Sequence, residues 1–186
     1  MDLDAPGSRA RYELSLVPDW GDIERVRVSV GLCADVVGRN GELRHAVTLA
    51  TCELLENAIR HSPVGALIDY SLAVENGRAT VRVGNPCAPG SEDGERLESV
   101  IRWIAGFSDP RLAYIERLRQ IVAAREGKKG GLGLVRVAYE GGCRLSCSLA
   151  PEQARVTVEA QFVISQQPRA LTELAPVVGA AQVPAR

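Results

Sequence analysis

Hydrophobic and polar positions change their period several times along the chain, and each change marks a predicted element. Residues 11–17 alternate between polar and apolar side chains, which is typical of a strand with one buried face. We interpret residues 20–37 as a helix, although three valines in this segment also alternate as they would in a strand. Between Asn40, which can cap a helix, and His61, apolar residues recur at helical spacing and predict a longer helix.

The middle of the chain predicts a β-hairpin. Residues 67–74 and 79–84 alternate, and Asn76-Gly77 lies between them, which is the strongest short hairpin signal. We expect the second strand to end before Asn85-Pro86, because proline cannot donate a hydrogen bond to a neighbouring strand inside a sheet.

Helical spacing then returns, and the chain closes on a second hairpin. Apolar residues predict one helix around 97–104 and another that begins after Asp109-Pro110. A glycine-rich turn over 127–134 leads into a short helix, and residues 143–149 and 154–164 form the last hairpin. Antiparallel strands with helices on one face predict a two-layer α/β sandwich.

These elements predict one domain over residues 11–165. Residues 1–10 precede the first strand, and residues 166–186 are rich in Ala, Pro and Val without a clear period. We therefore expect a flexible N-terminus and a flexible C-terminal tail around a single folded unit.

Composition narrows the classes of function. The chain has 186 residues, of which 46% are hydrophobic, so it is long enough to bury a core. A formal net charge of −1 argues against a binder of nucleic acid or anionic membranes. No apolar run is long enough to span a bilayer and the N-terminus lacks a signal pattern, so we expect a cytoplasmic protein. The five cysteines contain no CxxC pair, and we expect them to be small buried residues rather than redox or zinc-binding groups.

A polar stripe on the long helix is the first candidate for chemistry. At 100° per residue, Glu53, Asn57 and Arg60 fall along one flank of the apolar stripe, and Glu56 points further toward solvent. A carboxylate and an amide at the edge of a core need partners, and a bound cation with phosphates would supply them. The carboxylate could also accept a proton from an attacking water or hydroxyl group. The alternative is an ordinary helix flank with a Glu56–Arg60 ion pair.

The glycine-rich turn is the second candidate. Glycines let the backbone approach a phosphate, and the helix N-terminus that follows offers free N–H groups. The turn fits neither the Walker A nor the Rossmann pattern, and it can also be a plain loop before a helix. The candidate phosphate-binding residues are Lys128, Lys129, Gly130, Gly131, Leu132, Gly133 and Leu134.

Together, the two segments resemble the GHKL (histidine-kinase-like) ATPase superfamily. Residues 53–61, ELLENAIRH, resemble its N box, ExxxNAxxH, and residues 131–134 resemble its G2 box. The resemblance implies a Bergerat ATP-binding fold, with a mixed, mostly antiparallel sheet, helices on one face and a lid over about 86–130. It also implies that Asn57 holds Mg²⁺, that Arg60 lies near the phosphates and that the glycine turn wraps the triphosphate of ATP.

Within the superfamily, the chain is most similar to anti-sigma-factor serine kinases and to SiaB-type regulators. Those kinases phosphorylate STAS-domain antagonists, so the resemblance implies Glu53 as the base and a STAS-domain protein or a sigma factor as the partner. Dimerisation is expected by analogy alone. The family's G1 box usually carries DxGxG, whereas this chain has Asn85-Pro86, which keeps an acceptor oxygen for adenine but loses the charge.

Three functions remain open at this point. The chain can be a Ser/Thr protein kinase that uses ATP and Mg²⁺, or a binding module without catalysis that sequesters a regulatory protein. An independent ATPase ranks last, because nothing marks a second domain that would use the energy. The helices around 94–125, with Trp103 and Phe107, are a candidate partner surface, although plain packing also explains their spacing.

Overall fold

The computed structural model contains every helix and strand that the pattern predicts. It describes residues 10–17, 19–37, 41–88, 91–124, 131–150, 152 and 154–164. The elements are β1 (Ala10–Leu16), α1 (Trp20–Val37), α2 (Gly41–His61), β2 (Ile68–Glu75), β3 (Arg78–Pro86), α3 (Asp93–Ala105), α4 (Pro110–Ala123), α5 (Gly133–Glu140), β4 (Arg144–Ala150) and β5 (Arg155–Val163). The segment that could be read as helix or strand is the helix α1. Of the predicted flexible ends, residues 1–9 and 166–186 lie outside the described residues, whereas Ala10 begins β1. The Asn40 cap and the turn residues Lys128, Lys129 and Gly130 also lie outside the described residues.

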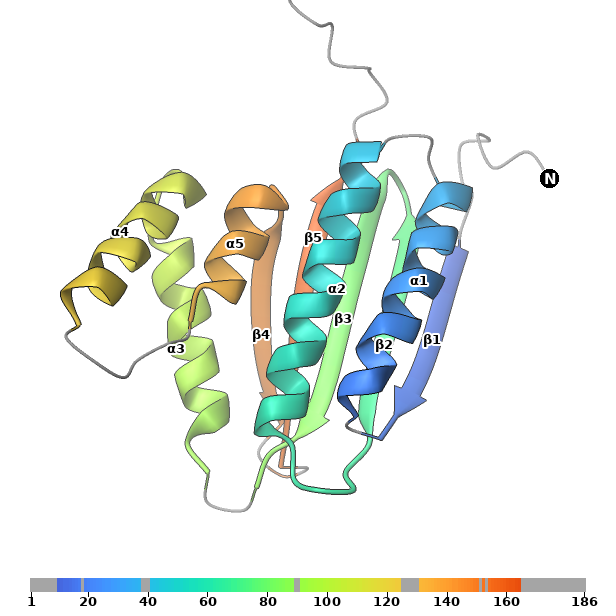
Figure 1. Ribbon diagram of the computed structural model, residues 1–186, viewed down its shortest axis with the longest axis horizontal. Helices are drawn as coiled ribbons and strands as arrows, with labels where there is room; N and C mark the ends of the chain where they lie inside the picture. The colour runs from blue at the N-terminus through green and yellow to red at the C-terminus, as the bar shows by residue number, and fades with distance from the viewer. Residues whose placement is uncertain are drawn as a thin grey trace, which may run out of the picture.

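The five strands form one open sheet in the order β1-β2-β3-β5-β4. Figure 1 shows the helices together on one side of this sheet, which confirms the two-layer α/β sandwich. All four strand pairs are antiparallel: β1–β2, β2–β3, β3–β5 and β5–β4. The expected sheet was mixed and mostly antiparallel, but the described strands contain no parallel pair.

Alternation along the strands places the core between the two layers. Tyr70 on β2, Val81 on β3 and Ala160 on β5 are buried beneath the helices, whereas the residues next to them face the open side of the sheet. From α2, Leu54 and Leu55 enter the same core. The long helix therefore lies across the centre of the sheet, with its polar flank turned toward the neighbouring helices.

One expectation about β3 is wrong. The strand was expected to end before Asn85, but it continues through Pro86 and pairs with β5 up to Pro86–Arg155. Pairing with β2 ends earlier, at Asp69–Gly84. Proline is tolerated because β3 pairs only with β5 at this position. Its missing N–H therefore interrupts no hydrogen bonding to β2.

The helices α3, α4 and α5 build the other half of the helical layer. Gly94 allows α3 to pack closely against the sheet, because a Cβ there would lie 2.9 Å from the Leu149 side chain. The side chain of Asp109 caps α4 by accepting a hydrogen bond from the backbone N–H of Arg111 at 2.8 Å. None of the described helices is both long and apolar enough to cross a membrane.

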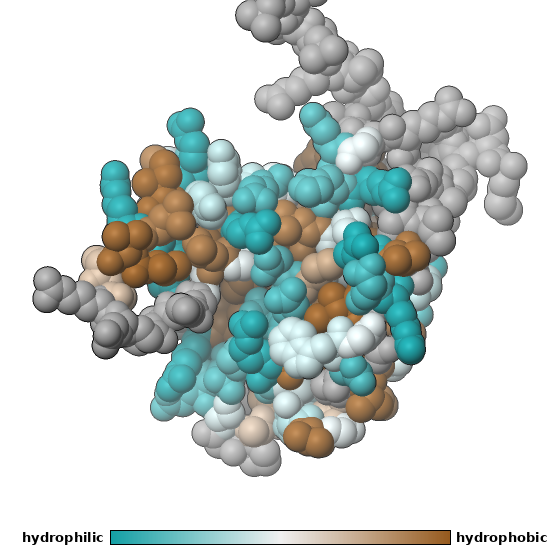
Figure 2. Space-filling model, viewed as in Figure 1, coloured by the Kyte–Doolittle hydropathy of each residue, from teal (hydrophilic) through white to brown (hydrophobic). Residues whose placement is uncertain are grey.

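The candidate partner surface divides into two parts. Trp103 and Phe107 pack edge to face with ring centroids 4.9 Å apart and lie against the core, so packing explains them. By contrast, α4 exposes a stripe of apolar side chains, and Figure 2 shows hydrophobic atoms gathered over this helix. The exposed residues are Leu112, Ile115, Leu118 and Val122.

Candidate functional site

A pocket of about 450 Å³ opens between α2, α3, α5 and the ends of β3 and β5. Its apolar walls come from the helices and from the two strands beneath them. The apolar lining residues are Leu54, Ala58, Val83, Leu97, Val100, Leu132, Leu134, Val156 and Val158. Charged and polar side chains gather around these walls, which is the usual composition of a small-molecule site.

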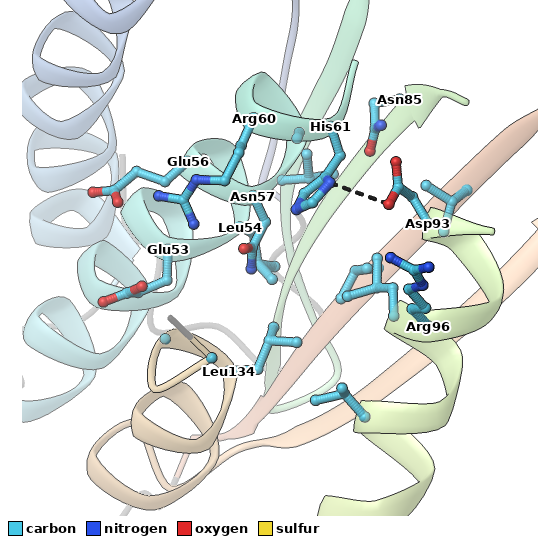
Figure 3. A pocket seen from close by; sticks show the side chains of 18 of the residues that line it. Glu53, Leu54, Glu56, Asn57, Arg60, His61, Asn85, Asp93, Arg96 and Leu134 are labelled. Atoms are coloured by element: carbon cyan, nitrogen blue, oxygen red, sulfur yellow. Dashed lines mark ion pairs between the residues drawn. The ribbon is translucent and has the colours of Figure 1, made fainter. Parts of the chain in front are cut away.

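The predicted polar stripe of α2 lies along one side of this pocket. Glu53, Asn57 and Arg60 all line it, and Figure 3 shows their side chains projecting from consecutive turns of the helix. Glu56 also lines the pocket, although the sequence analysis placed it further toward solvent. The alternative Glu56–Arg60 ion pair does not form among the described residues; instead, Arg60 acts electrostatically on Glu53.

Glu53 is held by an arginine that the sequence did not single out. Arg136 on α5 donates through Nη1 to Glu53 Oε1 at 3.1 Å. Burial raises the pKa of Glu53, and the nearby Glu56 carboxylate raises it further, while Arg136 and Arg60 oppose the change. A carboxylate with a raised pKa in a pocket is a stronger proton acceptor than an exposed one, which makes Glu53 a candidate base.

The glycine turn lies directly beside Glu53. Gly131 has a φ of +90°, which favours glycine, and Gly133 begins α5. A Cβ at residue 133 would lie only 2.2 Å from Glu53 Oε2, so the carboxylate can lie here only because residue 133 has no side chain. Leu132 and Leu134 line the pocket with these glycines. The predicted phosphate-binding turn therefore lies against Glu53, the residue predicted to act as the base.

The other end of the pocket is formed where β3 and α3 approach each other. Asn85 is only 5% exposed, and its Nδ2 donates to the carbonyl oxygen of Pro86 at 3.1 Å. Figure 3 shows Asn85 beside the pair formed by His61 and Asp93, whose Nδ1 and Oδ1 atoms are 3.6 Å apart. A hydrogen bond from Ser91 lowers the pKa of Asp93, and His61 contributes to the same change.

Three charged residues line the pocket without having been predicted from the sequence: Asp93, Arg96 and Arg136. Asp93 and Arg96 lie in the first turns of α3, and Arg136 lies one turn into α5. The position of Arg136, three residues after Gly133, was the one available signal, since a side chain there lies close to the helix N-terminus. The contacts of Asp93 and Arg96 depend on how α3 packs, which spacing does not reveal.

The fold is shared with a known complex-forming protein. A chain in the crystal structure of the SiaB–SiaC complex from Pseudomonas aeruginosa matches this chain with a TM-score of 0.64 and 22% sequence identity. The match covers 80% of this chain and 88% of that chain. No protein-family model and no curated protein matches the sequence. The structural match establishes a shared fold, and the resemblance of the motifs to GHKL ATPases stays a prediction.

Proposed function

We propose that this protein is a regulatory switch that binds ATP and Mg²⁺ and phosphorylates a serine or threonine of a STAS-domain partner. The observation that carries the proposal is the meeting of Glu53 and Asn57 with the Gly131–Leu134 turn in one pocket. The matching fold comes from a complex of two proteins, which supports a protein partner for this chain as well.

The base and the metal-binding group would come from neighbouring turns of α2. The partner's hydroxyl oxygen attacks the γ-phosphorus of ATP, a new P–O bond forms, and the bond from phosphorus to the β–γ bridging oxygen breaks so that ADP leaves. Glu53 accepts the hydroxyl proton. Because the pKa of Glu53 is raised by burial, it is a stronger base than an exposed glutamate.

The residues of the pocket fit a magnesium ion that is bound mainly through the nucleotide. The described residues contain no group of three Asp, Glu, His or Cys side chains that could hold a metal by themselves. Mg²⁺ commonly takes only one or two protein oxygens and the rest from phosphates and water, so the Asn57 amide oxygen suffices. When bound, the ion would neutralise charge on the phosphate oxygens.

The other end of the pocket would hold the base of the nucleotide. Asn85 uses its Nδ2 for Pro86, which leaves its Oδ1 as an acceptor. The carboxylate of Asp93 is a second acceptor at this end. Two acceptors suit an exocyclic amino group such as that of adenine, and the apolar walls suit a flat ring.

A second function is favoured by one specific observation. Among the described residues of β3, Asn85 is the only polar side chain that lines the pocket. Its Nδ2 group already donates a hydrogen bond to Pro86, so it is not available to a ligand. The protein would then be a binding module that sequesters a regulatory protein, with weak or absent nucleotide binding. Tight partner binding that is unaffected by ATP, without a phosphorylated product, would favour this function.

Calorimetric titration with ATP and Mg²⁺ tests the nucleotide site. The wild type is expected to bind saturably, and Asn57→Ala and Asn85→Ala are expected to lose the binding. Gln161→Ala, an exposed position on β5 outside the pocket, is the matched control and should bind as the wild type does. A folded wild type that binds no ATP would exclude the kinase.

Phosphate transfer to a purified STAS-domain protein tests the chemistry. Glu53→Gln keeps the size of the side chain but removes the proton acceptor, so we expect transfer to fall by on the order of 100-fold or more while partner binding persists. Undiminished transfer by this variant would exclude Glu53 as the base.

A further inference from the structure

A chain of charges joins α2 to α5 at the edge of the pocket. The Arg136 guanidinium donates through Nη1 to Glu53 Oε1 at 3.1 Å. Its Nε and Nη2 donate to the two carboxylate oxygens of Glu140 at 3.3 Å each. Because a guanidinium is a rigid planar fork, carboxylates on two of its edges fix both its position and its rotation. We refer to Glu53, Arg136 and Glu140 as the clamp.

Gly133 provides the space that the other carboxylate oxygen of Glu53 occupies. A Cβ at this position would lie 3.1 Å from the carboxyl carbon of Glu53 and 2.2 Å from its Oε2, and the second distance is closer than a side chain can approach. One carboxylate oxygen of Glu53 therefore lies against the first turn of α5, and the other accepts the hydrogen bond from Arg136. The hydrogen bond from Arg136 thus orients the carboxylate, and the lack of a side chain at residue 133 leaves room for it.

Glu53 needs such support because its surroundings disfavour its charge. Its side chain is only 18% exposed, and burial raises its pKa, as do the carboxylates of Glu56 and Glu140. Arg136 is the largest influence that lowers this pKa, and Arg60 acts in the same direction. Removing Arg136 would raise the pKa of Glu53 further and would remove the hydrogen bond that orients its carboxylate. A carboxyl group that is protonated or turned away cannot accept a proton from a bound hydroxyl group.

We propose that Arg136 is a positioning residue that holds Glu53 charged and oriented for proton transfer, with Glu140 orienting Arg136 in turn. This inference rests on the function proposed above, since it assigns Arg136 a part in the same reaction. It differs from two simpler roles. A purely structural ion pair would also change the titration of Glu53, but its loss would leave the rate and the pH profile of transfer unchanged in a folded variant. A phosphate ligand would act chiefly on ATP affinity.

The first test needs no nucleotide. The side-chain carboxyl of Glu53 is titrated by NMR on ¹³C-glutamate-labelled protein in the wild type, Arg136→Gln and Arg82→Gln. Arg82 pairs with Glu159 at 2.9 Å on the open face of the sheet, so its variant removes the same charge and the same kind of bond elsewhere. We expect the pKa of Glu53 to rise in Arg136→Gln and to stay unchanged in Arg82→Gln. An unchanged titration in Arg136→Gln would overturn the proposal.

The second test measures phosphate transfer against pH. In Arg136→Gln we expect a transfer rate lower by about tenfold or more at neutral pH, with the acidic limb displaced to higher pH. The Kd for ATP should change less than it does in Asn57→Ala. Arg136→Lys keeps the charge but lacks the rigid planar fork that fixes the geometry, so it should restore the limb more fully than the rate. A loss confined to ATP affinity would make Arg136 a phosphate ligand instead.

A steric variant gives an independent reading of the same contact. Gly133→Ala is expected to push the Glu53 carboxylate away from α5 and to lower transfer without removing any charge. Gly41→Ala, at the start of α2, is the matched control, because a Cβ there meets no atom within 4 Å. Equal transfer rates in the two alanine variants would contradict the role of Gly133 in the clamp.

The outcomes separate this inference from the proposed function. If the wild type binds no ATP but Arg136→Gln still raises the pKa of Glu53, the clamp is supported and the kinase function fails. If the wild type transfers phosphate while Arg136→Gln changes neither the titration nor the pH profile, the kinase function stands and the positioning role is overturned.

Discussion

At the scale of single residues, Glu53 combines a functional benefit with a cost in stability. Because its pKa is raised in the folded protein, the folded state binds more protons than the unfolded state between the ordinary value of 4.5 and the raised value. The free energy of unfolding therefore decreases as the pH rises through this interval. Above this interval the charged carboxylate is a net cost to the fold, even though Arg136 offsets part of it.

This sign gives a prediction for Glu53→Gln. The neutral isostere should raise the melting temperature at pH 7, and the gain should shrink as the pH falls toward 4.5, because the wild-type carboxyl group becomes increasingly protonated. Thermal unfolding followed by circular dichroism at several pH values measures the effect. Glu159→Gln, which breaks the Arg82 pair outside the pocket, is the control and should give no such gain. A lower melting temperature for Glu53→Gln at pH 7 would contradict the argument.

Residues predicted from spacing and residues found by packing differ in kind. Glu53, Asn57 and Arg60 could be placed on one flank because the geometry of a helix is local and regular. Arg136 and Asp93 reach the pocket only because α5 and α3 pack beside α2. Such contacts join residues far apart in the chain, so the sequence pattern alone contains no measure of them.

At the scale of elements, α2 has two faces with different tasks. Its pocket face carries the polar stripe, and its opposite side enters the core through residues such as Leu55, which is 1% exposed. Leu55 does not line the pocket, so it can be altered without changing the candidate site directly.

Leu55→Ala therefore tests what holds the helix in place. Removing a fully buried leucine side chain leaves a cavity, and we expect the free energy of unfolding to fall by roughly 2–5 kcal/mol. Chemical denaturation measures the change. Leu112→Ala on α4, where the leucine is 45% exposed, should cost much less. Similar losses in the two variants would show that the core does not depend on α2 in this way.

The strand β3 illustrates how far a local rule applies. Proline was expected to end the strand, and in a strand paired on both sides it would have done so. Here β2 stops pairing at Gly84, and Pro86 pairs only toward β5. The rule about proline was sound, but whether it applied depended on where a neighbouring strand ends. That neighbouring strand begins at Ile68, so the residues around Pro86 do not reveal its position.

At the scale of the whole molecule, the pocket exists only in the folded state. Its walls come from α2, α3, α5, β3 and β5, which are far apart along the chain. A ligand that binds there has no comparable site in the unfolded chain. Binding must therefore stabilise the fold by an amount fixed by the ligand concentration and its Kd.

This linkage yields the last prediction. With ATP and Mg²⁺ at about 100 times the Kd, the free energy of unfolding should increase by about 2.7 kcal/mol, and the melting temperature should rise accordingly. Asn57→Ala should show a much smaller rise, and Mg²⁺ without nucleotide should have little effect on the wild type, because few protein oxygens are available to hold it.

Hydrogen exchange should slow mainly in α2, α3 and α5, which border the pocket, and little in β1 and α1 at the opposite edge of the sheet. If ATP changes neither the melting temperature nor the hydrogen-exchange rates of the wild type, the binding module is favoured. The partner protein should then produce the stabilisation that ATP does not.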